Sequence, residues 1–229
     1  MTRISRVVPA ILTDDPKALE TMVRLAESFT NYVQFDIMDG SFVPSRSISW
    51  KHLTDLPMQL KWEAHLMVLQ PEDYLPDFQR AGAQRVFFHY EATDTHQKVI
   101  SLARDLGLEI GLAVNPETPI SAILPLVAKL DSILFMAVNP GFYGAKFIPE
   151  VLNKITKFRR THPDVEIGID GGIKESNIKL IAQNGVDCIY VGSAIFLQPQ
   201  PGESFRHLTV LAQKGSRQHN IEKASTELL

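Results

Sequence analysis

The stretch Tyr32-Val-Gln-Phe-Asp-Ile-Met38 is a short run of mostly apolar and aromatic residues, and the turn residues Asp39 and Gly40 follow it. A run of this length and composition predicts a buried β-strand. Seven further short apolar runs recur along the chain, with longer amphipathic stretches between them. Their bounds are Val7–Leu12, Leu60–Val68, Arg85–His89, Glu109–Val114, Ser132–Val138, Glu166–Asp170 and Cys188–Val191.

The stretches between the runs have helical patterns. Pro16–Glu27 and Pro149–Arg160 both begin with a proline, which suits the first turn of a helix. Strands that alternate with helices predict βαβ units and a parallel sheet. Eight units in 229 residues favour a closed α/β barrel, the (β/α)₈ or TIM barrel, over an open doubly wound sheet. No G-x-G-x-x-G follows the first run, which also disfavours the dinucleotide-binding fold.

We therefore expect a single barrel domain over residues 1–229, with a last helix near Ser204–Lys214 and a polar tail from about residue 215. The composition, 45% hydrophobic and 21% charged, is typical of a globular protein. A net charge of −3 argues against nucleic acid or an anionic membrane as a partner. The one cysteine fits a reducing compartment, and the N-terminal apolar run is too short for a signal segment. We expect a cytoplasmic protein.

The ends of three predicted strands are unusually polar. Side chains two residues apart share a face of a strand, and the carboxyl ends of barrel strands form the active-site face. Phe35 and Ile37 suit the helix-covered outside, so the alternate residues are expected to point into the barrel. These inward sets are Gln34, Asp36 and Met38; Glu63, His65 and Met67; and Glu166, Gly168 and Asp170.

A carboxylate inside a barrel is unfavourable unless it is paired or bound to a metal ion. We interpret Asp36, His65 and Asp170, near the mouth, as a functional group in which the two aspartates face each other. Glu63 and Glu166 lie deeper along their strands, and there we expect a structural hydrogen-bond network. Met38, Met67 and Met136 lie at corresponding heights. Core packing is the ordinary role of methionine, but at one rim the three could contact a reactive anion.

Two glycine-containing strand ends predict a phosphate site. Gly171 and Gly172 follow one strand, and Gly192 and Ser193 follow the next. Glycines let backbone N–H groups approach an anion at a helix N-terminus, and this barrel commonly binds phosphate after its last two strands. A third loop, Gly141-Phe142-Tyr143-Gly144, suits a lid over the ligand.

Several longer strings resemble the ribulose-phosphate 3-epimerase family in order and spacing, over about residues 9–196. They are Phe35-Asp-Ile-Met-Asp-Gly-Ser-Phe-Val-Pro44, Ala64-His-Leu-Met-Val68, His89-Tyr-Glu-Ala-Thr93, Val138-Asn-Pro-Gly-Phe142, Ile169-Asp-Gly-Gly172 and Val191-Gly-Ser-Ala-Ile-Phe196. The resemblance implies a barrel isomerase of carbohydrate metabolism that inverts the carbon next to the ketone of a pentulose 5-phosphate. The simplest reaction is D-ribulose 5-phosphate to D-xylulose 5-phosphate.

The resemblance also implies roles for particular residues. Asp36 and Asp170 would be the acid and base of proton transfer through an enediolate, and also ligands of one divalent metal ion. His65 would be a further ligand. Inversion needs proton donors on opposite faces of the substrate, which agrees with two carboxylates from distant strands. The phosphate would bind at Gly171, Gly172, Gly192 and Ser193, with Gly141 to Gly144 closing over the sugar.

The sequence departs from the family pattern at three positions. Gln34 stands where the family has the remaining histidine ligand, Ala10 where it has a substrate-contacting serine, and Ala145 where its lid usually has glutamine. An amide oxygen is a poorer zinc ligand than imidazole but can serve Mn²⁺ or Mg²⁺. The metal could thus be Zn, Mn, Fe or Mg.

Two alternatives to a pentulose-phosphate epimerase stay open. A hexulose 6-phosphate 3-epimerase would use the room that Ala10 leaves in place of serine. A phosphosugar-binding barrel without epimerase activity would have lost its metal site at Gln34. In each case the partner is a small sugar phosphate. A homo-oligomer is usual in the family and is expected here.

Overall fold

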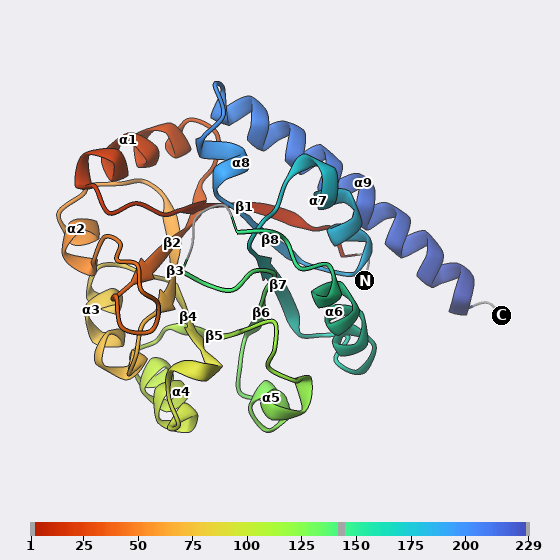
Figure 1. Ribbon diagram of the computed structural model, residues 1–229, viewed down its shortest axis with the longest axis horizontal. Helices are drawn as coiled ribbons and strands as arrows, with labels where there is room; N and C mark the ends of the chain where they lie inside the picture. The colour runs from red at the N-terminus through yellow and green to blue at the C-terminus, as the bar shows by residue number, and fades with distance from the viewer. Residues whose placement is uncertain (1–2, 142–144, 228–229) are drawn as a thin grey trace.

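The structure, a computed structural model, describes residues 3–141 and 145–227, with side chains up to residue 221. Its eight strands are parallel and form a closed barrel in chain order, as the sequence predicted (Figure 1). Five strands have the predicted bounds, β1 and β3 differ from them by one residue at each end, and β6 ends two residues earlier. The strands are β1 Arg6–Ile11, β2 Tyr32–Met38, β3 Lys61–Met67, β4 Arg85–His89, β5 Glu109–Val114, β6 Ser132–Met136, β7 Glu166–Asp170 and β8 Cys188–Val191.

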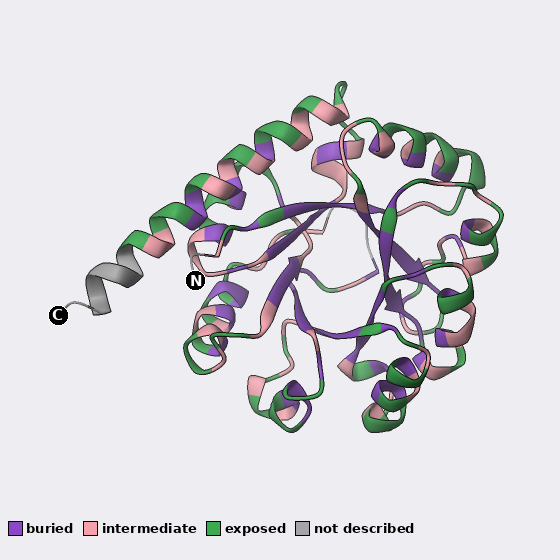
Figure 2. Cartoon of the chain, turned by 180° about the vertical axis from the view of Figure 1, so that it is seen from behind, coloured by how far each residue is buried: buried purple, intermediate pink, exposed green. Residues whose placement is uncertain are grey.

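Helices surround the barrel and bury one face each against it (Figure 2). In α1, Leu19, Val23 and Ala26 are buried at a spacing of four and three residues, as an amphipathic helix requires. The helices are α1 Pro16–Glu27, α2 Trp50–Thr54, α3 Leu75–Arg80, α4 His96–Asp105, α5 Ile120–Val127, α6 Glu150–Thr161, α7 Glu175–Gln183, α8 Ser193–Phe196 and α9 Pro201–Glu227, with short 3₁₀ turns η1 Pro71–Asp73 and η2 Tyr90–Ala92.

The last helix is longer than the sequence predicted. Instead of ending near Lys214, α9 continues to Glu227, and its C-terminal end projects beyond the barrel (Figure 1). Gly215 looks like a helix stop in the sequence, but it has a packing role. A Cβ at this position would lie 2.3 Å from the carbonyl oxygen of Lys179 and 2.8 Å from the Cβ of Ala182. The glycine therefore lets α9 pack directly against α7.

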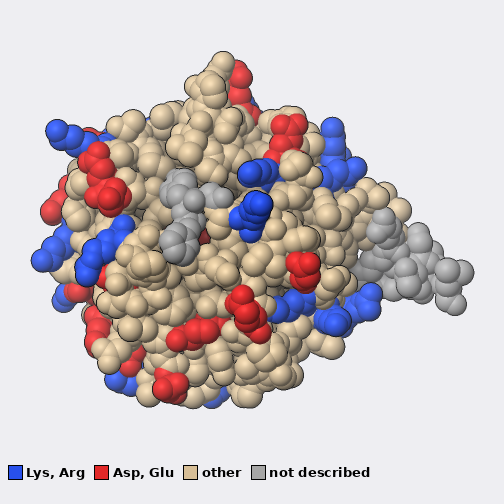
Figure 3. Space-filling model, in the orientation of Figure 1, with Lys and Arg blue, Asp and Glu red and all other residues tan. Residues whose placement is uncertain are grey.

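No helix among the described residues is both long and apolar enough to cross a membrane. Acidic and basic side chains are interspersed over the face shown in Figure 3. Among the described residues of that face, no large patch of one charge sign is visible.

The lower half of the barrel interior contains the expected network of charged groups. Arg85 contacts the carboxylates of Glu63, Glu109 and Glu166, and the Glu63 side chain is fully buried. The hydroxyl of Tyr32 donates to Glu63 Oε2 at 2.8 Å. Burial raises the pKa of Glu63, and the positive charge of Arg85 opposes that rise. Arg85 is thus the main cation that offsets the buried charge of Glu63, and Arg6 adds a second ion pair to Glu166 at 3.5 Å.

Replacing Arg85 with methionine is expected to lower the free energy of unfolding by about 3 kcal/mol, because the fully buried Glu63 loses its partner Arg85. The matched control is Arg80→Met, since Arg80 pairs with Asp77 at the surface with 68% of its side chain exposed. That change is expected to stay within about 0.5 kcal/mol. Urea denaturation measures both, and equal midpoints for the two variants would show that the network does not hold the barrel together.

Candidate active site

A pocket opens at the carboxyl ends of the strands, where the sequence placed the site. It is lined by residues from β1, β2, β3, β6, β7 and β8 and from the segments that follow β1, β6, β7 and β8. The predicted site residues that line it are Asp36, Met38, His65, Met67, Met136, Gly141, Asp170, Gly171, Gly172, Gly192 and Ser193. Phe142, Tyr143 and Gly144 of the expected lid lie outside the described residues. Gln34 does not line the pocket but contacts two residues that do.

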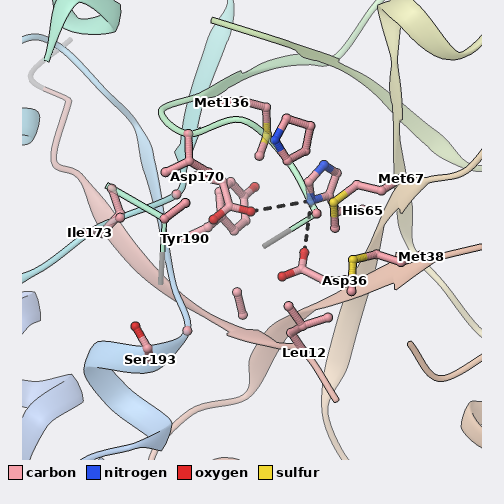
Figure 4. A pocket seen from close by; sticks show the side chains of 18 residues that line it. Leu12, Asp36, Met38, His65, Met67, Met136, Asp170, Ile173, Tyr190 and Ser193 are labelled. Atoms are coloured by element: carbon pink, nitrogen blue, oxygen red, sulfur yellow. Dashed lines mark hydrogen bonds and ion pairs between the residues drawn. The ribbon is translucent and has the colours of Figure 1, made fainter. Parts of the chain in front are cut away.

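Asp36, His65 and Asp170 form one cluster at the floor of this pocket (Figure 4). The Nδ1 atom of His65 lies 3.0 Å from Asp36 Oδ1 and 3.5 Å from Asp170 Oδ2. The side chains are 0%, 10% and 13% exposed for His65, Asp36 and Asp170. One ligand atom from each of the three residues lies within 4.8 Å of the others. Two carboxylate oxygens and an imidazole nitrogen at this separation form a ligand group for a divalent metal ion.

Electrostatics inside the cluster are dominated by two carboxylates out of water. Burial and the neighbouring charge of Asp170 raise the pKa of Asp36 to about 6, against hydrogen bonds from His65 and Gln34. Burial alone would lower the pKa of His65. Hydrogen bonds to Asp170 and Asp36, with the charges of these groups, outweigh that effect and raise the pKa to about 9. Without a metal ion, an imidazolium therefore balances the aspartates at neutral pH.

Gln34 bridges the two aspartates from below. Its amide nitrogen donates to Asp36 Oδ1 at 2.9 Å and to Asp170 Oδ2 at 3.1 Å. The amide oxygen of Gln34 is buried without a hydrogen-bond partner among the described residues. Rotating the amide would turn this oxygen toward the carboxylates, where it could serve as a ligand only beside a cation. The residues present thus fit a divalent ion with oxygen and nitrogen ligands.

The glycines at the other end of the pocket have backbone geometry that a side chain would not permit. Gly171 and Gly172 have φ angles of +108° and +65°. A Cβ at Gly172 would lie 2.8 Å from the backbone nitrogen of Phe147. These two residues link β7 to α7, while Gly192 and Ser193 lead from β8 into α8. Both strand ends therefore open into helices beside the pocket, as the sequence predicted.

His89, beside the pocket, and Tyr190, which lines it, were not among the predicted site residues. His89 ends β4, is fully buried, and places its Nε2 2.9 Å from the Nε2 of His65. Burial lowers its pKa to about 4. Tyr190 points inward from β8 and lines the pocket, and its ring occupies the space beside Gly168. Strand alternation could have found both, because His89 continues the inward face of Phe87 and Tyr190 that of Cys188.

The sequence model of the Ribulose-phosphate 3 epimerase family matches residues 6–196, which is most of the barrel. The chain belongs to this family. Ribulose-phosphate 3-epimerase of Schizosaccharomyces pombe is 35% identical over 87% of this chain and 90% of that protein. The Escherichia coli (strain K12) ribulose-phosphate 3-epimerase is 38% identical over 84% of this chain and 89% of the relative.

Solved structures outside the ribulose-phosphate 3-epimerase family share the fold. A 3-hexulose-6-phosphate synthase aligns with a TM-score of 0.70 and 14% identity, over 90% of this chain and 99% of the other. Orotidine 5'-monophosphate decarboxylase of Sulfolobus solfataricus aligns with a TM-score of 0.64 and 11% identity, over 92% and 99%. At these identities the likeness shows the barrel alone.

Metal binding is expected to release about one proton per ion at pH 7, because a metal ligand must be deprotonated and the pKa of His65 is about 9. Because the pKa of His65 is raised, the proton competes with the metal ion below about pH 9. Affinity should rise as pH increases from 7 to 9 and should level off above that. Calorimetric titration in buffers of different ionisation enthalpy measures the proton count. Binding without proton release would mean that His65 is already neutral or is not a ligand.

The Gln34→His variant is expected to bind Zn²⁺ about tenfold more tightly or better, because imidazole is the stronger zinc ligand. Gln59→His is the matched control, since it adds a histidine at an exposed position away from the pocket. Competition with a chromogenic chelator gives both affinities. An unchanged affinity for Gln34→His would show that residue 34 does not face the metal position.

Proposed function

We propose that this chain is an isomerase that inverts the carbon next to the ketone of a ketose phosphate, converting D-ribulose 5-phosphate to D-xylulose 5-phosphate. Membership of the ribulose-phosphate 3-epimerase family supports the reaction class. The observation that carries the proposal is the convergence of two carboxylates, Asp36 from β2 and Asp170 from β7, on one buried cluster in the pocket. Along the shorter path around the barrel, β1 and β8 separate these strands.

Asp36 and Asp170 are the proton-transfer groups in this proposal. One carboxylate removes the proton from the substrate carbon, the C–H electron pair forms a C=C bond to the ketone carbon, and the carbonyl π pair moves to the ketone oxygen to give an enediolate. The other carboxyl group returns a proton to the opposite face while the electrons move back. A pKa of about 6 for Asp36 suits a group that both accepts and donates protons near neutral pH. The methionines Met38, Met67 and Met136 pack around the reacting carbons.

Asp36, His65 and Asp170 would hold one divalent ion, with the Gln34 amide oxygen as a further ligand. When bound, the ion supplies Lewis-acid stabilisation of the oxygen on which negative charge develops. The oxygen-rich ligand group favours Mn²⁺ or Mg²⁺, with Fe²⁺ and Zn²⁺ as the other candidates. Before an ion binds, hydrogen bonds from Gln34 and His65 hold the two carboxylates close together.

The phosphate binds at the backbone of Gly171, Gly172, Gly192 and Ser193 in this proposal. Their positions at the ends of β7 and β8 support it, because this barrel commonly binds phosphate there. Gly141 lines the same pocket, so the loop from Gly141 to Gly144 would close over the sugar.

One observation favours a second substrate. Ala10 lines the pocket and offers only a methyl group where the family has a serine. A hexulose 6-phosphate, which is one carbon longer, would use this room.

Cytoplasmic location stays a prediction, supported by the rice relative named as a cytoplasmic isoform, which is 35% identical over 87% of this chain and 90% of that protein. Assembly as a homo-oligomer also stays a prediction.

Asp36→Asn and Asp170→Asn are each expected to lower kcat at least about a thousandfold, because an amide cannot carry the proton. The control is Asp164→Asn, since Asp164 is exposed in the loop that leads into the opposite end of β7. A coupled assay with D-ribulose 5-phosphate and added Mn²⁺ measures the rates. Comparable activity in an Asp36 or Asp170 variant would remove that residue from the mechanism.

The substrate is decided by kcat/KM for a pentulose 5-phosphate and a hexulose 6-phosphate, measured with the same protein and metal. We expect the pentulose to be preferred by about tenfold or more. A reversed preference would favour the hexulose epimerase. No turnover with either sugar, under Mn²⁺, Zn²⁺, Fe²⁺ or Mg²⁺, would contradict epimerase activity and leave a phosphosugar-binding barrel.

A further inference from the structure

A line of polar side chains runs from the ligand cluster to the outer edge of the barrel mouth. His65 on β3 contacts His89 at the end of β4, and His89 lies beside Glu91 in η2. Neither His89 nor Glu91 touches the pocket, and the chemistry described above uses neither of them. Each contact in this line restricts which ring nitrogen can carry a proton, so the contacts together indicate the tautomers of the two histidines.

The first link is a hydrogen bond between two imidazoles. The Nε2 atoms of His65 and His89 are 2.9 Å apart, and both rings are fully buried. The ring centres are 5.0 Å apart and the ring planes are inclined by only 25°. The two nitrogens therefore point at each other along the ring planes, as an N–H···N bond requires. One of the two nitrogens must donate and the other must accept.

The second link decides which nitrogen donates. The other ring nitrogen of His89, Nδ1, lies 3.5 Å from Glu91 Oε2, within ion-pair range. A carboxylate accepts hydrogen bonds and does not donate them, so it favours a proton on His89 Nδ1. A neutral His89 with its proton there has a bare Nε2. His65 must then supply the N–H between the rings.

The third link fixes Glu91 in place. Its Oε1 accepts hydrogen bonds from the backbone nitrogen of Asn115, at 3.0 Å, and from the hydroxyl of Thr118. Lys154 of α6 holds that same loop, because its ammonium donates to the carbonyl oxygens of Asn115, Pro116 and Thr118 at 3.1, 2.7 and 2.7 Å. Oε2 is thereby left to face His89.

We propose that His89 and Glu91 are positioning residues that keep a proton on Nε2 of His65, so that the proton His65 gives up to a metal ion is the one on Nδ1, the nitrogen that faces Asp36 and Asp170. The inference rests on the proposed function in taking His65 as a ligand. Without His89 and Glu91, which we call the relay, neutral His65 would place its proton on Nδ1 and donate it to Asp36, 3.0 Å away. That tautomer has no lone pair for the ion. Hydrogen bonds to the outer nitrogen of a ligating histidine commonly have this effect.

Glu91→Gln is the sharpest test because it preserves shape and replaces the acceptor nearest His89 Nδ1 with an amide that can donate. The amide oxygen can still accept from Asn115 and Thr118, and the amide nitrogen then donates toward His89 Nδ1. Glu117→Gln is the matched control, since it removes a carboxylate from the same loop at an exposed position. His89→Phe is a second variant that keeps the ring but removes the acceptor, and thermal unfolding checks that each variant folds.

Two measurements on the full chain decide the proposal. Long-range ¹H–¹⁵N spectra of the metal-free protein, recorded above pH 9 where His65 is neutral, report the tautomer of His89, assigned through the His89→Phe spectrum. We expect the proton on Nδ1 in the unchanged chain and on Nε2 in Glu91→Gln. Mn²⁺ titration should show affinity about tenfold lower or more for Glu91→Gln and His89→Phe, and unchanged for Glu117→Gln.

His89 protonated on Nε2 in the unchanged chain would overturn the proposal. So would equal Mn²⁺ affinity of Glu91→Gln and the unchanged chain. If the unchanged chain binds neither Mn²⁺ nor Zn²⁺, the metal part of the proposed function fails, and the tautomer spectra alone then decide the relay. Metal titration of the unchanged chain thus tests the proposed metal site, and the tautomer spectra test the role of His89 and Glu91 separately.

Discussion

Two carboxylates that share a buried pocket repel each other, and the arrangement around Asp36 and Asp170 follows from what offsets that repulsion. A side chain able to carry a positive charge, His65, lies within 3.0 and 3.5 Å of them. The neutral amide of Gln34 donates to both. A divalent ion at the same place would offset the repulsion between the carboxylates more strongly than the imidazolium does, because it carries twice the charge. The site is therefore built for a cation, whether a proton on His65 or a metal ion supplies it.

Single strands of the barrel contribute both to the ion-pair network of the lower interior and to the cluster at the mouth. On β3, Glu63 faces Arg85 in the lower interior, and His65, two residues on, faces the aspartates at the mouth. On β7, Glu166 and Asp170 are divided in the same way. A side-chain period of two gives each strand an inward residue at both levels. The ion pairs of Arg85 hold the strands together in the lower interior, and these strands in turn position the side chains at the mouth.

Much of the fold could be predicted because its determinants are local. Strand alternation placed Asp36 and His65 inside the barrel, and the glycine pairs marked the strand ends beside the pocket. What could not be predicted depends on contacts distant in sequence. Gly215 reads as a helix stop until α7 is seen against it. The amide orientation of Gln34 depends on Asp170, 136 residues away. Strand alternation could have placed His89 inside the barrel, but its contact with His65 depends on the pairing of β3 with β4.

Hydrogen exchange with solvent tests most directly whether the two aspartates serve opposite faces of one carbon. Each of Asp36→Asn and Asp170→Asn is incubated in D₂O with D-ribulose 5-phosphate and, separately, with D-xylulose 5-phosphate. NMR then follows deuterium at the epimerised carbon. If each carboxylate addresses one face, each variant exchanges the proton of one sugar only, and the two variants exchange different sugars. Exchange of both sugars by a single variant would show that one group reaches both faces, and would contradict the two-aspartate mechanism.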